Sequence, residues 1–260
     1  MKILVGIKHV PDTEAKVKIA ADGVSLDESA IKMVMSPFDE YALEEALRIR
    51  EARGGEVVLV CAGKESAQAS LRQGLAMGAD RGVLIEDDRF DRADGLARAR
   101  AIAAVARAEA PDLILLGKYG VGTDDGQTGP MLAEVLDLPH TSAVISLALG
   151  EGTFEARREI EGAVEVAQGS LPAVITCDKG LNEPRYPALK GIMAAKKKPL
   201  DVKKAADLGL DPDDLAPGRR VVWESLAMPP GRKAGRVITG EAAETAREVA
   251  RLLHEEAKVI

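Results

Sequence analysis

Apolar runs and helical patterns alternate along the first 140 residues. Continuous apolar runs predict buried strands at residues 2–7, 56–62, 82–85 and 112–117. Apolar residues at helical spacing predict helices from Ser36 to about residue 53, at 66–77 and at 93–108. Strands that alternate with helices form right-handed crossovers, so the sequence predicts an α/β fold with a mainly parallel, Rossmann-like sheet.

The first helix carries signals at both ends. Ser36 suits the N-cap, Pro37 suits the first helical position, and acidic residues fill the first turn. Gly54 and Gly55 then predict the end of the helix.

The pattern changes after Pro139. Short strand candidates separated by Gly and Pro follow at 142–149, 153–160, 163–168 and 173–178, and they predict an antiparallel extension of the sheet. From Lys179 onward periodicity is weak until a helical stretch at 241–258. Long irregular chain is usually functional or ordered by a partner. We therefore divide the chain into an α/β domain (1–183) and an anchor loop with an extended C-terminal arm (184–260), and expect Trp223, Leu226 and Met228 to lie on another subunit.

Composition restricts the function classes. The net charge of −7 argues against nucleic acid as the main partner. No apolar run approaches the ~20 residues of a membrane helix and no signal-peptide pattern is present, so we expect a cytoplasmic protein without membrane insertion. Cys61 and Cys177 lie in apolar runs and predict buried thiols rather than a metal site. A single Asn with abundant Arg and Glu favours a thermophile.

The richest segment for chemistry is the stretch 117–130, which has five glycines in fourteen residues between a strand and a helix. Glycines let backbone amides approach an anion, and a helix N-terminus adds positive partial charge. The loops after Ile7 and Cys61 would converge on this stretch at the carboxyl ends of the strands. A phosphate group fits there, although neither GxGxxG nor GxxxxGK[ST] is present. The alternative is that the Gly-rich stretch only reverses the chain direction and binds no ligand.

Catalytic groups are sparse. His9, His140 and His254 lie near no nucleophile motif, so each is interpreted as structural. Asp124 and Asp125 suit amide capping or ribose contacts better than Mg²⁺. We predict no catalytic and no metal-ligating residue. The basic run 196–198 is either a solvated connector or a docking patch.

Two blocks at 171–176 and 181–198 closely resemble the signature of electron transfer flavoprotein beta subunits. Three further blocks, at 3–8, 35–38 and 76–82, agree in order and spacing. The resemblance covers essentially the whole chain. It implies a sheet of the adenine-nucleotide-binding type and an electron carrier subunit rather than an enzyme.

The resemblance implies a heterodimer in which the alpha subunit holds most of one redox-active FAD and the beta subunit holds a structural AMP. Phe38 matches an aromatic residue near the flavin, or else belongs to the core, and Thr13 replaces a Tyr found there in relatives. Thr123 and Gly126 stand where relatives have an acid and an Asn. Asp124, Gln127 and Thr128 are expected as polar contacts. The AMP contacts carried over to this sequence are Gly6, Ser36, Ala62, Gly117, Lys118, Tyr119, Gly120, Val121, Gly122, Thr123, Asp124, Asp125, Gly126, Gln127 and Thr128.

The resemblance also implies partners. Acyl-CoA and related dehydrogenases, as in fatty acid oxidation, would deliver electrons, and a quinone oxidoreductase would receive them. Leu189 matches an anchor that enters a dehydrogenase pocket, and exposure beside Pro187 would suit a hot spot. A Leu189 that folds inward is the alternative. Glu159 matches an acid that pairs with the mobile flavin domain. Further docking residues are expected at Tyr186, Lys190, Ile192, Met193 and Lys197.

Two other functions stay open. In the electron-bifurcating type FAD replaces AMP and the loop reads DGDTxQVGP, whereas residues 125–130 lack the Asp-Gly-Asp-Thr order, which favours AMP. A stand-alone adenine-nucleotide-binding enzyme, such as an adenylating protein, would need a motif such as SGGxDS between Ile7 and Ser36, and none is present. A nucleotide sensor would be a stable monomer with a folded tail.

Overall fold

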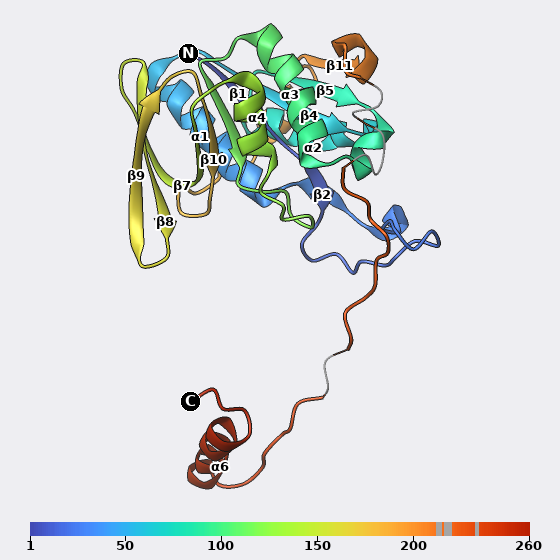
Figure 1. Cartoon of the computed structure of the whole chain (residues 1–260), viewed down its shortest axis with the longest axis vertical. Helices are drawn as coiled ribbons and strands as arrows, with labels where there is room; N and C mark the ends of the chain where they lie inside the picture. The colour runs from blue at the N-terminus through green and yellow to red at the C-terminus, as the bar shows by residue number, and fades with distance from the viewer. Residues whose placement is uncertain (212–214, 216–219, 232–233) are drawn as a thin grey trace. The chain divides into compact units, whose positions relative to one another are not determined.

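The computed structural model describes residues 1–211, 215, 220–231 and 234–260, which fall into two compact units, Met1–Leu226 and Ala227–Ile260 (Figure 1). The second unit contains the helix α6 (Ala242–Glu255). The elements of the first unit, in chain order, are β1 (Lys2–Gly6), β2 (His9–Pro11), η1 (Glu28–Ala30), β3 (Met33–Met35), α1 (Pro37–Arg53), β4 (Glu56–Gly63), η2 (Glu65–Ala67), α2 (Gln68–Met77), β5 (Arg81–Glu86), η3 (Asp88–Arg92), α3 (Gly95–Glu109), β6 (Leu113–Gly117), α4 (Thr128–Leu136), β7 (His140–Leu149), β8 (Thr153–Ile160), β9 (Ala163–Ser170), β10 (Ala173–Cys177), α5 (Leu189–Ala195), β11 (Leu200–Lys204) and η4 (Ala205–Leu208).

The main sheet has nine strands in the order β11-β5-β4-β1-β6-β10-β7-β8-β9. Neighbouring strands from β11 to β7 are parallel, while β8 pairs antiparallel with both β7 and β9. The predicted α/β fold, with its mainly parallel sheet and antiparallel extension, is confirmed.

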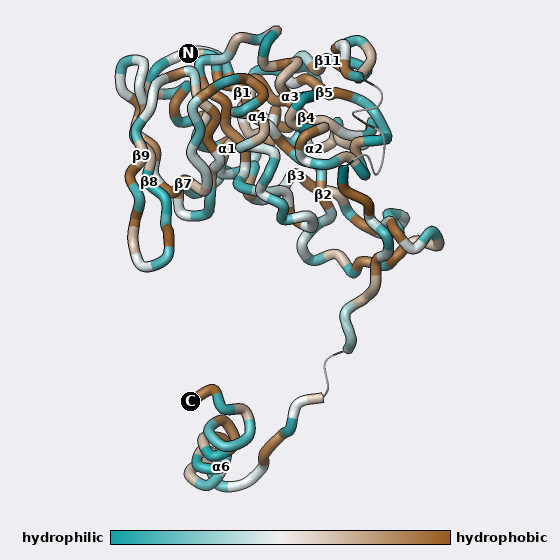
Figure 2. The backbone as a smooth tube through the Cα atoms, in the orientation of Figure 1, coloured by the Kyte–Doolittle hydropathy of each residue, from teal (hydrophilic) through white to brown (hydrophobic). Residues whose placement is uncertain are grey.

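Side chains of the central strands alternate between two cores. In β1, Ile3 and Val5 join the core covered by α1 and α2, whereas Leu4 joins the core covered by α3 and α4. Apolar residues accordingly gather around β1 and β4 in Figure 2. Because both faces are covered, these strands are continuous apolar runs without polar alternation.

The position of β10 corrects one prediction. We expected residues 173–178 to belong to the antiparallel meander, but β10 lies between β6 and β7 and is parallel to both. All five of its residues are buried, as is typical of a central parallel strand. The chain therefore returns to the middle of the sheet after the β8–β9 hairpin.

Short elements were missed by the periodicity analysis. The three-residue strands β2 and β3 form a separate antiparallel pair. α5 and β11 lie within the segment predicted as anchor loop and arm, and β11 pairs with β5 at the edge of the sheet. The boundary between the two compact units follows Leu226. The boundary that we predicted after residue 183 separates the α/β domain from an arm that wraps a partner subunit, and it stays a prediction.

The ends of α1 follow the sequence with one exception. Ser36 occupies the N-cap and Pro37 follows, and Gly54 ends the helix with a φ of 75°. The Ser36 hydroxyl, however, makes no capping hydrogen bond. Cys61 and Cys177 are buried free thiols, as predicted. None of the helices in the described ranges has both the length and the apolar character needed to cross a membrane.

Candidate functional site

Two adjoining cavities lie beyond the carboxyl ends of β1, β4 and β6. The larger has a volume of about 440 Å³ and the smaller about 60 Å³. Lys8, Ala62 and Arg98 line both, so the cavities are neighbours in one crevice. β1 lies between β4 and β6 in the sheet. The crevice is therefore at the switch point where open α/β sheets bind ligands, as the sequence predicts.

The buried carboxylate of Asp39 joins the ends of two strands. Its Oδ1 accepts a hydrogen bond from the Gly117 N–H at 2.9 Å, and its Oδ2 accepts one from the Lys8 N–H at 2.8 Å. Burial raises the pKa of Asp39 to about 7, although both amide bonds act to lower it. A Cβ on Gly117 would lie 2.5 Å from Asp39 Oδ1 and 2.7 Å from the Phe38 backbone, so only glycine permits this approach.

Two cationic side chains reach the crevice, Lys8 from the end of β1 and Arg98 from α3. Lys8 Nζ donates to Thr123 Oγ1 at 2.7 Å, and Arg98 Nη2 donates to the Phe90 carbonyl at 2.8 Å. Within the described ranges neither side chain forms an ion pair. Burial lowers the pKa of both, to about 8 for Lys8, where the Arg98 charge adds to the effect.

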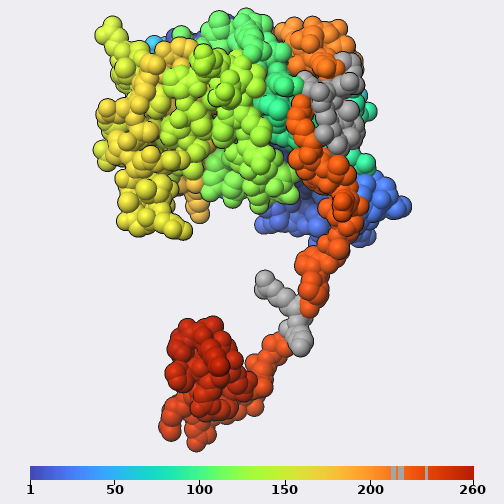
Figure 3. Space-filling model, in the orientation of Figure 1, coloured from blue at the N-terminus to red at the C-terminus, as the bar shows by residue number. Residues whose placement is uncertain are grey.

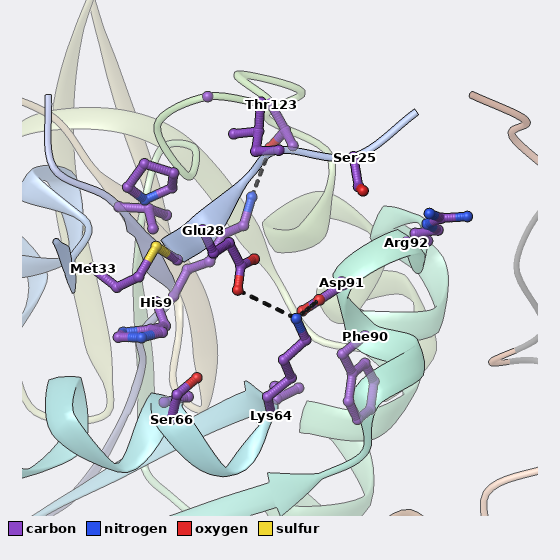
Figure 4. Close-up of a pocket in the computed structure, with 18 of the residues that line it drawn as sticks. His9, Ser25, Glu28, Met33, Lys64, Ser66, Phe90, Asp91, Arg92 and Thr123 are labelled. Carbon is purple, nitrogen blue, oxygen red and sulfur yellow. Dashed lines mark hydrogen bonds and ion pairs between the residues drawn. The ribbon is translucent and has the colours of Figure 1, made fainter. Parts of the chain in front are cut away.

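The wall of the larger cavity joins three segments (Figure 4). Lys64 points toward Glu28 and Asp91; it pairs with Asp91, and its Nζ lies 3.4 Å from Glu28 Oε2. His9 also lines this cavity, and its Nδ1 lies 2.7 Å from Ser70 Oγ. Burial lowers the pKa of His9, which keeps the ring neutral near pH 7. These contacts connect the loop after β2 with the ends of β4 and η3.

The end of the first unit also reaches this cavity. The Leu226 N–H donates to the Gly23 carbonyl at 2.8 Å, and Trp223, 43% exposed, lines the larger cavity. Figure 3 shows this orange segment against the blue N-terminal loop. The prediction that Trp223, Leu226 and Met228 contact another subunit stays a prediction.

Most residues that the resemblance assigns to the AMP site line one of the two cavities. Ser36, Phe38, Asp124 and Gln127 line neither. The buried Ser36 Oγ has no hydrogen-bond partner among the described residues. Asp124 has a φ of 47° and accepts from the Gly122 N–H at 3.2 Å. The assigned residues that do line a cavity are Gly6, Ala62, Gly117, Lys118, Tyr119, Gly120, Val121, Gly122, Thr123, Asp125, Gly126 and Thr128.

Phe38 belongs to an aromatic group beside the crevice. Its ring centroid lies 4.5 Å from that of Tyr119, and Lys118 Nζ lies 4.9 Å and 5.0 Å from the two centroids. Lys118 also pairs with Asp178 at 2.9 Å. Phe38 is partly buried and is a member of neither core cluster, and its place near the flavin stays a prediction.

A second region of interest is the stretch at residues 186–193, which we call the 186–193 segment. Four of its large hydrophobic side chains are exposed: Tyr186 by 94%, Leu189 by 75%, Met193 by 66% and Ile192 by 47%. Leu189 is the first residue of α5 and does not fold inward. A group of exposed apolar side chains is typical of an interaction surface.

The chain before this segment is held to α1. Arg185 Nε donates to Glu44 Oε2 at 2.8 Å, and its Nη1 donates to Glu51 Oε1 at 2.5 Å. The Glu44 side chain is 3% exposed, so this contact is shielded from water. Asn182 adds bonds to the Tyr41 carbonyl and to the Glu45 carboxylate, each at 3.0 Å.

The chain after this segment is held to α2. Arg72 Nη1 donates to the carbonyls of Ala195 and Lys198 at 2.6 Å and 2.8 Å. Lys198 Nζ donates in turn to the carbonyls of Leu75 and Ala79 at 3.0 Å and 2.6 Å. Lys198, one member of the basic run 196–198, is therefore partly buried and holds the end of α2, so it is not a solvated connector.

The remaining predicted docking residues are exposed. They include Lys190, Lys197 and Glu159, which lies on β8 opposite Val164. The structure brings Lys190 and Lys197 to the 186–193 segment and its end, whereas Glu159 lies on the β8–β9 hairpin.

Three residues of the crevice were missed from sequence. Lys8 was quoted only as part of a matching block, and Asp39 only as an acid in the first turn of α1. Arg98 lies within a helix pattern that carried no functional signal. The described residues contain no group of three or more His, Cys, Asp or Glu side chains arranged to hold a metal ion. Two cations and the glycine-rich backbone meet in one crevice, which favours binding of an anion.

Comparison with known proteins matches the sequence to one family. The family described as "Electron transfer flavoprotein domain" matches residues 23–208. The chain is 40% identical to the electron transfer flavoprotein subunit beta of Bacillus subtilis over 261 residues, which covers 100% of both chains. It is 42% identical to the Bradyrhizobium diazoefficiens subunit (90% of this chain, 92% of the relative) and 40% identical to the Homo sapiens subunit (90% and 91%). The chain therefore belongs to the family of electron transfer flavoprotein beta subunits.

Proposed function

We propose that this chain binds a structural AMP and pairs with an alpha subunit that holds most of one FAD. The pair accepts electrons from acyl-CoA and related dehydrogenases and passes them to a quinone oxidoreductase. The flavin supplies the electron chemistry, while this chain supplies binding surfaces and orientation. The observation that carries the proposal is the crevice in which the Gly-rich loop, the end of β1 and the end of β4 meet.

The residues of the crevice fit an adenine nucleotide. Backbone groups at Gly6, Ala62 and the Gly-rich loop 117–128 are open to a ligand, and Gly117 allows a close approach that a side chain would block. The larger cavity, at about 440 Å³, lies within the usual range of roughly 300–1,000 Å³ for ligand pockets. The buried Ser36 hydroxyl has no hydrogen-bond partner among the described residues. It lies just beyond the end of β1, where the Ser36 backbone N–H bonds the Lys8 carbonyl.

The test is the identity of the bound nucleotides. The full chain is purified alone and with its alpha partner, each sample is denatured, and the released nucleotides are identified by chromatography and mass. We expect one AMP with this chain and one FAD only with the partner present. Two FAD per pair would instead indicate the electron-bifurcating type, and no nucleotide in either sample would contradict the assignment of the Gly-rich loop.

The same proposal assigns dehydrogenase docking to the 186–193 segment. Its exposed apolar side chains are presented by a backbone that Arg185, Arg72 and Lys198 hold at both ends. A pre-organised surface loses little conformational entropy on binding, so its apolar area contributes efficiently to affinity. Leu189 is the proposed anchor, and Glu159 is proposed to pair with the mobile flavin domain from the hairpin.

Leu189→Ala should weaken docking without weakening the fold. Because the side chain is 75% exposed, its loss removes interface area but leaves no cavity in the core. An anchor residue typically contributes at least about 2 kcal/mol, which is roughly 30-fold in affinity. Electron transfer from each dehydrogenase is measured against partner concentration. The control is Val202→Ala, which removes a 44% exposed side chain on β11. Equal effects of the two variants would contradict the anchor role.

A further inference from the structure

Lys8 and Arg98 come from different elements and line the same two cavities. In the described part of the chain their hydrogen bonds go to neutral oxygens, the Thr123 hydroxyl and the Phe90 carbonyl. Cations that are taken out of water lose free energy unless an opposite charge compensates them. The lowered pKa of each group reflects this penalty, and for Lys8 also the nearby Arg98 charge.

Acidic groups near the pair do not remove this imbalance. Asp39 uses its two oxygens to accept the Gly117 and Lys8 amides, and burial raises its pKa to about 7. Asp125 lines the smaller cavity and acts to raise the pKa of Lys8 and Arg98, but it is exposed, and burial still lowers both pKa values. Asp124 is exposed and caps a loop amide, so water screens its charge. The local environment of Lys8 and Arg98 therefore favours an anion as a third partner.

The smaller cavity has the size of one anionic group. Its volume of about 60 Å³ is far below the roughly 300–1,000 Å³ that is usual for ligand pockets, so a small group fits it better than a nucleoside. Besides the two cations and the carboxylates of Asp39 and Asp125, its lining includes Gly120, Gly126 and Thr128, the first residue of α4. Backbone amides and the positive end of a helix favour an anion at such a place.

We propose that Lys8 and Arg98 bind the phosphate group of the nucleotide in the smaller cavity, and that the nucleoside occupies the larger cavity next to it. The inference rests on the proposed nucleotide-binding function and adds the residues that recognise its charge. The Lys8 ammonium and the Arg98 guanidinium donate to phosphate oxygens, which are stronger acceptors than the neutral oxygens they bond in this structure.

The experiment compares AMP with adenosine, which lacks the phosphate. The complex with the alpha subunit is unfolded, freed of nucleotide and refolded, and the binding of each ligand is measured by calorimetry. Arg98→Gln should weaken AMP binding by roughly 10- to 100-fold, the equivalent of one hydrogen bond between charged groups, and leave adenosine binding unchanged. Lys8→Gln should act on AMP in the same selective way.

The matched control is Arg107→Gln. Arg107 lies on the same helix α3, is exposed, and donates to the Val135 carbonyl away from the crevice. It should change neither affinity. If Arg98→Gln weakened AMP and adenosine equally, or weakened neither, the phosphate assignment would be wrong. If the wild-type complex bound neither ligand, the proposed function itself would fail, so the two failures are distinguishable.

If Arg98→Gln does not fold, Arg98→Lys provides a second route, because it keeps the charge and removes the planar guanidinium. The ratio of AMP to adenosine affinity should then fall less than for Lys8→Gln. Raised salt should weaken AMP binding to the wild-type complex and leave adenosine binding constant. A salt-independent AMP affinity would overturn the proposal.

Discussion

The crevice and the 186–193 segment differ in where their charges and apolar side chains lie. In the crevice, Lys8 and Arg98 are partly buried and form no ion pair within the described residues. Beside the 186–193 segment, Arg185 is paired with the carboxylates of Glu44 and Glu51, while the apolar side chains face solvent. The first region is complementary to a small anion, and the second is complementary to an apolar surface.

The two regions are also held in place differently. The crevice depends on close backbone approach, since Asp39 bonds the amides at the ends of two strands. The 186–193 segment depends on side chains. Arg185 bonds α1 before it, while Lys198 bonds the end of α2 and Arg72 on α2 bonds the chain after it. Backbone changes should therefore damage the crevice most, and side-chain truncations should damage the segment most.

The largest effect is expected for Gly117→Val. The new side chain would overlap the Asp39 carboxylate and the Phe38 backbone, and forced overpacking of this kind destabilises by about 3 kcal/mol. Bound nucleotide should be lost as well, because Asp39 must move away from the amides of Lys8 and Gly117 that it bonds. Thermal unfolding and the nucleotide content of the purified complex measure the two effects.

Gly235→Ala is the control for this change. A Cβ at Gly235 meets no atom within 4 Å, and its φ is not in the left-handed region. Both readouts should equal those of the wild type. A Gly117→Val complex that kept its full nucleotide content would contradict the claim that backbone approach builds the crevice.

Arg185→Ala should affect the other region, with a smaller loss. It leaves the buried Glu44 carboxylate with only Arg48 and the backbone N–H of residue 185 as partners, which destabilises by about 2 kcal/mol. Dehydrogenase docking should weaken while the nucleotide content stays constant. The control is Arg251→Ala on α6, where the ion pairs with Glu248 and Glu255 are exposed and water screens them. Loss of nucleotide in Arg185→Ala would show that the regions are not separate.

The sequence predicts elements well where one local pattern fixes them. The buried strands around β1, β4 and β6 and the helices α1 to α4 follow from apolar runs and end signals. The position of β10 does not, because its partners β6 and β7 are set by long-range pairing that its own five residues do not encode. Elements as short as β2 or α5 contain too few residues for periodicity to appear.

The same limit applies to the crevice. The glycines at 117–128 predict an anion site from sequence because they lie together in one continuous stretch. Arg98 has no such signal. It belongs to the crevice only because the fold brings it to the same cavity as Lys8, which lies 90 residues earlier in the sequence. Asp39 reads as an ordinary acid at a helix start, and only its burial against two strand ends reveals its role.

Asp39→Asn should change the pH dependence of stability. Burial raises the pKa of Asp39 from 3.8 to about 7, so between these values the folded chain keeps a proton that the unfolded chain releases. Raising the pH through this window therefore destabilises the wild type by up to about 1.4 kcal/mol per pH unit, and Asn removes this contribution. Urea unfolding at pH 4.5, 5.5 and 6.5 measures the slope.

Asp201→Asn, which removes an exposed carboxylate on β11, is the control and should keep the wild-type slope. If Asp39→Asn also kept it, Asp39 would be ionised throughout this window, and the buried charges of the crevice would already be balanced without a ligand.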